Sequence, residues 1–139
     1  MSMGALLNDR LPLWRAADEL EVEILNPDPD YGPDYLADPL VVKGKIAVCT
    51  LHSILTAATL LKTPDAAARL AGVPLFFTAC EGDRLTPAAD LLQFVDLLRE
   101  AGHDNLTLEL LPGDRHDLLS GRDGPANAAG IAKFISKNI

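Results

Sequence analysis

Cysteines, aromatic residues and long apolar runs are all scarce in this chain of 139 residues. It has two cysteines, Cys49 and Cys80, and aromatic residues make up 5% of it. Two cysteines cannot form the disulfide framework of a small secreted domain, and their spacing fits no metal-binding motif, so we expect free thiols. No apolar run approaches the ~20 residues of a membrane-spanning helix.

Positive charge is scarce as well. The chain has 12 Lys and Arg against 20 Asp and Glu, which gives a net charge of −8. An acidic surface disfavours nucleic acid and anionic membranes as main partners. Residues 1–5 show no charged segment followed by an apolar one, so no signal peptide is predicted. We therefore expect a cytoplasmic protein, with peripheral contact to membranes left open.

The first 37 residues show little regular pattern. Leu20, Val22 and Ile24 alternate with glutamates, which predicts a short exposed strand. Four prolines then fall between residues 27 and 39, and this density favours an extended loop. We therefore expect an irregular segment over 1–37 and a second region over 38–139.

From residue 38 onward, helical and strand patterns alternate. Two Thr-Pro pairs, Thr63-Pro64 and Thr86-Pro87, have the form of a helix N-cap followed by a proline at the first helical position. The order from residue 73 predicts an α/β fold with parallel strands. The expected helices cover 41–61, 64–72, 87–101 and 124–139, and the expected strands cover 73–79 and 106–111.

One titratable residue follows each of the two predicted strands. Asp83 comes just after the strand over 73–79, and His116 just after the strand over 106–111. Because the carboxyl ends of parallel strands meet at one edge of a sheet, we expect both side chains at that edge, where open α/β sheets place active sites. A carboxylate beside an imidazole is the acid and base of a Ser-Asp-His triad, in the chain order of α/β-hydrolases.

Each residue also has a simpler interpretation. Asp83 alone could be a solvated acid that caps the next helix, and His116 alone could be a loop histidine bonded to backbone. Asp114, His116 and Asp117 could also form a metal site, although carboxylates around a loop histidine are usually solvated. The joint placement after consecutive strands favours catalysis.

Two stretches resemble one branch of the α/β-hydrolases. They are Glu81-Gly82-Asp83-Arg84-Leu85 and Leu111-Pro112-Gly113-Asp114-Arg115-His116-Asp117-Leu118-Leu119, and the similarity extends over about 35–139. They resemble the monoglyceride lipase and lysophospholipase branch, related to the serine aminopeptidase S33 family and closest to the plant-type monoacylglycerol lipases. The fold implied is the C-terminal part of an α/β-hydrolase, preceded by a short cap-like segment.

The resemblance also implies roles for individual residues. It makes Asp83 the triad acid and His116 the triad base, and it makes residues 10–37 the tail of a substrate-covering cap. Trp14 and Tyr35, in that segment, would then either contact an acyl substrate or simply pack locally. The chain departs from the family at Cys80, where the family usually has glycine.

The nucleophile is the weakest part of the predicted triad. Met1-Ser2-Met3-Gly4-Ala5 matches the family's Gly-x-Ser-Met-Gly-Gly/Ala turn except for the leading glycine. Such a turn needs a strand before the serine and a helix after it, and we expect neither here. Ser2 is therefore only a candidate nucleophile, and part of the oxyanion hole is expected to be missing.

Two functions follow as hypotheses. The first is a truncated serine hydrolase of carboxylic esters that needs no cofactor and takes a small lipid-like substrate, with weak or no activity alone. The second is a non-catalytic interaction module. Two parallel strands make a marginal sheet with unpaired edges, so we expect self-association through a sheet edge.

Overall fold

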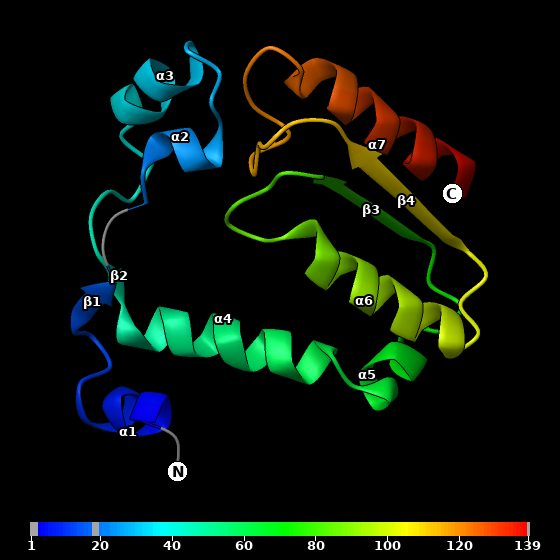
Figure 1. Ribbon diagram of the computed structural model, residues 1–139, viewed down its shortest axis with the longest axis horizontal. Helices are drawn as coiled ribbons and strands as arrows, with labels where there is room; N and C mark the ends of the chain where they lie inside the picture. The colour runs from blue at the N-terminus through cyan, green and yellow to red at the C-terminus, as the bar shows by residue number, and fades with distance from the viewer. Residues whose placement is uncertain (1–2, 18–19, 139) are drawn as a thin grey trace.

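The computed structural model describes residues 3–17 and 20–138, and it has the mixed helices and parallel strands of a partial α/β-hydrolase fold (Figure 1). The strands are β1 (Arg15–Ala17), β2 (Ile46–Ala47), β3 (Leu75–Cys80) and β4 (Leu106–Leu111). The helices are α1 (Met3–Arg10), α2 (Val22–Leu25), α3 (Tyr31–Ala37), α4 (Val48–Leu61), α5 (Pro64–Arg69), α6 (Ala88–Glu100) and α7 (Gly124–Asn138).

A parallel pair of strands, β3 and β4, forms the centre of the second half of the chain. Leu75 pairs with Leu106 and the register continues without a bulge to Cys80 and Leu111. Helices cover both faces of β3, which explains why the strand carries apolar residues on both faces. Phe76 contacts Phe134 of α7 and Phe77 contacts Phe94 of α6, with ring centroids 5.3 and 6.0 Å apart. Neighbouring strand residues point to opposite faces, so α6 and α7 cover opposite sides of the sheet.

The fully buried apolar residues lie on α5, on α6 and at the end of β3. Val95 and Leu98 on α6 are 0% exposed, and so is Cys80 at the end of β3. The Cys80 thiol therefore packs inside, with its Sγ 3.8 Å from the Pro112 carbonyl oxygen. Cys49 and Cys80 are both free thiols.

The expected irregularity of 1–37 is wrong for most of that segment. Its described residues contain α1, β1, α2 and α3. The predicted strand over 20–24 is also wrong, because α2 covers Val22–Leu25 and β1 takes β2 as its partner instead. A proline lies inside α3, yet Pro33 is in the first turn, where backbone N–H groups have no partner within the helix. The boundary at residue 37 between the two regions stays a prediction.

The two Thr-Pro pairs have different structures. Thr63 is the predicted N-cap of α5, and its hydroxyl accepts a hydrogen bond from the Ala66 N–H. The same prediction for Thr86 is wrong, since the N-cap of α6 is Pro87 and Thr86 contacts the turn before it. The helix predicted over 41–61 begins only at Val48, after Gly44, whose φ of 98° is incompatible with a helix.

No helix within residues 3–17 and 20–138 is both long and apolar enough to cross a membrane.

Candidate active site

The turns after β3 and β4 lie against each other. The Gly82 N–H donates a hydrogen bond to the Gly113 carbonyl oxygen over 2.8 Å. A Cβ at Gly82 would lie 2.9 Å from that same oxygen, so glycine is required for this approach. Gly113 has a φ of 110°, which also favours glycine. The two turns that carry Asp83 and His116 are therefore joined by backbone contact.

Asp83 is held by hydrogen bonds to both of its carboxylate oxygens. Its Oδ1 accepts from the backbone N–H groups of Leu85 and Thr86 over 2.8 and 3.0 Å, and its Oδ2 accepts from the Thr86 hydroxyl over 2.7 Å. Burial raises the pKa of Asp83, but the hydrogen bonds from Thr86, His116 and Leu85 outweigh it, and the net shift is below the ordinary 3.8. Asp83 is therefore a carboxylate at neutral pH.

The structure brings His116 directly to that carboxylate. Its Nδ1 lies 2.9 Å from Asp83 Oδ2. The Asp83 side chain is 4% exposed, whereas the His116 side chain is 35% exposed. The acid is therefore enclosed, while the base remains accessible from solvent. With Nδ1 turned to Asp83, Nε2 is the nitrogen left to exchange a proton.

The first region of the chain holds the His116 loop in place. The carbonyl oxygen of Leu25, at the end of α2, accepts hydrogen bonds from the N–H groups of His116 and Asp117, each over 2.8 Å. Next to it, Asn26 is 2% exposed, and its Nδ2 donates to the carbonyl oxygens of Asp117 and Ser120 over 3.1 and 3.3 Å. The loop is therefore positioned by residues about 90 positions earlier in the sequence.

A cavity of about 300 Å³ adjoins the pair. Both Asp83 and His116 line it, together with polar Thr86 and Asp90. The rest of the lining is largely apolar and comes from β3, the start of α6 and the His116 loop: Thr78, Ala79, Pro87, Leu91 and Leu118. An accessible base beside a small, partly apolar cavity is an arrangement suited to proton transfer on a bound substrate.

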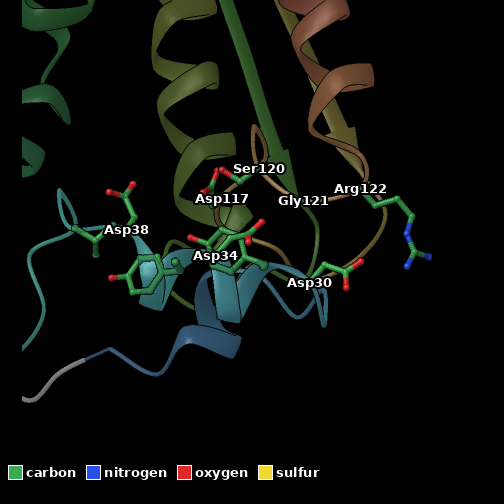
Figure 2. A pocket seen from close by; sticks show the side chains of 10 residues that line it. Asp30, Asp34, Asp38, Asp117, Ser120, Gly121 and Arg122 are labelled. Atoms are coloured by element: carbon green, nitrogen blue, oxygen red, sulfur yellow. The ribbon is translucent and has the colours of Figure 1, made fainter.

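A larger hollow of about 600 Å³ lies between the segment around α3 and residues 117–122 of the loop after His116 (Figure 2). The side chains of Asp30, Asp34 and Asp38 reach it from the segment around α3, and Asp117 reaches it from the loop. Burial, followed by the charge of Asp117 and a hydrogen bond with it, raises the pKa of Tyr31 in this hollow to about 12. Tyr31 therefore stays protonated and acts as a donor toward the acids.

The three residues of the alternative metal site, Asp114, His116 and Asp117, line three different hollows. Asp114 lines a hollow with Arg115 and Asp123, His116 lines the small cavity, and Asp117 lines the larger hollow. Within 3–17 and 20–138, no three His, Cys, Asp or Glu residues come close enough to hold a metal ion.

The remaining candidates lie elsewhere. Ser2 is outside the described residues, but α1 begins at Met3, so the expectation that no helix follows the serine is wrong. That helix packs on α4, and Figure 1 shows it far from the ends of β3 and β4. Tyr35 lines the larger hollow, and Trp14 lines no part of the small cavity.

Two functional residues were missed by sequence reasoning. Thr86 was assigned to a helix cap, although its distance of three residues from Asp83 is also typical of a side chain that bonds back to an aspartate. Asn26 gave no local pattern at all, because its partners are carbonyl groups far along the sequence.

The chain also matches a known protein family. The model of the family described as serine aminopeptidase, S33 matches residues 1–123, most of the chain and both candidate turns. The chain belongs to the serine aminopeptidase S33 family. Membership of the family supports a hydrolase function in general terms. Ser2, Asp83 and His116 all fall within the residues that the family model matches. A search of curated proteins found no match.

Proposed function

We propose that Asp83 and His116 are the acid and base of a serine hydrolase that cleaves carboxylic esters of the monoacylglycerol or lysophospholipid class. The observation that carries the proposal is the 2.9 Å contact between His116 Nδ1 and a buried Asp83 oxygen, beside a cavity that both residues line. The ester class comes from the sequence resemblance around these two turns, and the S33 family supports the hydrolase class.

The reaction would follow from the roles of the two side chains. His116 Nε2 accepts the proton of a serine hydroxyl as that oxygen attacks the ester carbonyl carbon, and the carboxylate of Asp83 stabilises the imidazolium that forms. The imidazolium then returns the proton to the leaving alcohol, which leaves an acyl-enzyme. Water attacks the acyl-enzyme with His116 again as base, and the fatty acid is released.

The cavity supports an uncharged, partly apolar substrate. Ala79, Leu91 and Leu118 offer apolar contact, whereas Asp90 and the chain's net charge of −8 are unfavourable for an anionic group. A monoacylglycerol combines an apolar chain with a neutral ester and therefore fits better than a lysophospholipid, whose headgroup carries an anionic phosphate. Ser2 is the nucleophile candidate from the sequence resemblance alone; α1, which begins at the next residue, lies far from the ends of β3 and β4 (Figure 1).

Hydrolysis assays test the proposal. A fluorogenic monoacyl ester and an aminoacyl anilide are compared, because the family description names a peptidase. We expect weak hydrolysis of the ester, a loss of at least about 10² in kcat for His116→Ala, and no loss for Asp114→Asn, an acid that lies outside the small cavity. Ester hydrolysis that is equal in wild type and His116→Ala would contradict the proposal, and hydrolysis of the anilide alone would overturn the ester class.

A second candidate function is self-association through β3, and a specific observation favours it. The Leu75 and Glu81 N–H groups both donate toward the β4 side, to Asn105 and Leu111 carbonyl oxygens over 3.0 Å. Backbone groups alternate along a strand, so those of Phe76 and Thr78 point to the opposite edge. Among the described residues, β4 is the only strand that pairs with β3.

The partner we propose for this edge is β3 of a second copy. The strand contains no charged residue, whereas β4 carries Glu109, a type of residue that discourages pairing at an exposed edge. An antiparallel pair centred on Thr78 would bring the outward backbone groups of the two copies together in a closed two-fold dimer.

Analytical ultracentrifugation tests the dimer. We expect a dimer for the wild type and a monomer for Thr78→Pro, because proline removes an N–H that points away from β4 and spares the β3–β4 ladder. Val73→Lys, a charge at an exposed position just before the strand, gives a second variant in case the proline variant does not fold. A wild-type monomer, or a dimer unchanged in a folded variant, would contradict this function.

A further inference from the structure

The Asp83–His116 pair has a third member in contact with both side chains. Thr86 Oγ1 lies 2.7 Å from Asp83 Oδ2 and 3.2 Å from His116 Nδ1, and Nδ1 itself lies 2.9 Å from Oδ2. These three atoms form a closed triangle. The Thr86 N–H also donates to the other Asp83 oxygen over 3.0 Å, so one threonine binds both oxygens of the carboxylate.

The positions of the protons in this triangle follow from the chemistry of its members. A threonine hydroxyl has one hydrogen and two lone pairs. The short contact with a charged oxygen takes the hydrogen, since a carboxylate is the stronger acceptor. The Thr86 oxygen can then present only a lone pair to His116 Nδ1. Both atoms that face Nδ1 are therefore acceptors, and a hydrogen on Nδ1 satisfies both.

We propose that Thr86 is a positioning residue that fixes the Nδ1-protonated tautomer of His116 and the rotation of the Asp83 carboxylate. In that tautomer the lone pair is on Nε2, the nitrogen that does not face Asp83, where a base must have it. Threonine suits this role because branching at Cβ restricts its χ1 angle. The catalytic part of this inference rests on the proposed function, whereas the tautomer can be observed without turnover.

The local helix gives Thr86 no competing role. Thr63 has the same Thr-Pro context and uses its hydroxyl as the N-cap of α5, but α6 has Pro87 as its N-cap and no side-chain cap bond. The Thr86 hydroxyl is therefore directed to Asp83 and His116. The two threonines form a natural pair for comparison, one in the site and one outside it.

Nitrogen-15 NMR of histidine-labelled protein tests the tautomer. We expect the neutral His116 ring to be protonated at Nδ1 in the wild type and in Thr86→Ser, which keeps the hydroxyl. In Thr86→Val, of similar shape but without the hydroxyl, we expect a measurable increase in the Nε2-protonated form. Thr63→Val is the matched control and should leave the His116 spectrum unchanged.

Two results would overturn the inference. One is a wild-type His116 protonated at Nε2, which needs no variant and holds even if Thr86→Val does not fold. The other is a folded Thr86→Val protein whose His116 spectrum matches the wild type, because Thr86 would then only stabilise the local turn.

Kinetics separate this inference from the proposed function. If the ester is hydrolysed, Thr86→Val should lower kcat about five- to tenfold, the effect of one hydrogen bond, with KM little changed and with recovery in Thr86→Ser. A tautomer change in a protein without ester hydrolysis would support the positioning role and contradict the proposed function. Ester hydrolysis by the wild type together with an unchanged His116 tautomer in Thr86→Val would support the proposed function and contradict the positioning role.

Discussion

Helices α4 and α6 have nearly the same length and opposite surroundings. α4 has 14 residues without a single Asp, Glu, Lys or Arg, and α6 has 13 residues, four of them charged. The more apolar helix is the more exposed one. Ile54 and Leu55 of α4 are 58% and 66% exposed, whereas Val95 and Leu98 of α6 are 0% exposed.

The two helices differ in how much of their apolar surface is packed against neighbouring elements. α6 has one apolar stripe, and β3 and α5 cover that stripe. α4 is apolar on all sides, a pattern typical of a helix covered on more than one side, and within the described residues it packs mainly on α1, α5, β1 and β2. The region over 63–138 therefore contains the well-packed unit, and the region over 3–61 contains most of the exposed apolar surface.

The largest expected effect tests this contrast directly. Leu98→Ala should lower the free energy of unfolding by about 2–5 kcal/mol, because it leaves a cavity in the packed core. Leu55→Ala makes the same chemical change on α4 and should cost within about 0.5 kcal/mol. Urea denaturation measures both. Equal losses would show that α4 is as well packed in solution as α6 and would break the comparison.

An intermediate effect is expected where the two regions meet. Asn26→Ala should cost about 1–3 kcal/mol, since it leaves buried carbonyl groups of the His116 loop without a donor. Asn8→Ala, on α1, is the matched substitution away from the loop and should have little effect. A folded Asn26→Ala protein with unchanged stability and an unchanged His116 NMR spectrum would show that the first region does not position the base.

The smallest expected effect is a change in pH dependence. The folded pKa of Asp83 lies below its ordinary value of 3.8, so its contribution to stability is fully present above about pH 3.8 and is lost as the pH falls through the folded pKa. The stability difference between wild type and Asp83→Asn should therefore shrink on acidification below pH 3.8. Asp96→Asn, an exposed acid of α6, serves as the control. A difference that is constant from pH 5 to 2 would contradict the shift.

The sequence predicted those parts of the site that depend on local pattern and sheet geometry. The strand over 106–111 is confirmed, and the strand predicted over 73–79 runs from Leu75 to Cys80. Asp83 and His116 meet because they follow neighbouring parallel strands, a rule that needs no tertiary detail.

Other features depended on contacts that no local pattern contains. Asn26 lies in a proline-rich stretch, and its role comes from carbonyl groups 91 and 94 residues away. Thr63 and Thr86 each precede a proline, yet Thr86 also has a histidine beside it in space. α2 was mistaken for a strand because alternation over five residues is too short to separate the two structures.

Labelling with a fluorophosphonate probe, followed by mapping of the modified residue, tests most directly whether Asp83 and His116 activate a serine. We predict a labelled serine, whose position the mapping identifies, and a rate that falls at least about 10²-fold in His116→Ala and falls in Asp83→Asn but not in Asp114→Asn. No labelling of the wild-type chain, or labelling at the same rate in His116→Ala, would contradict this account.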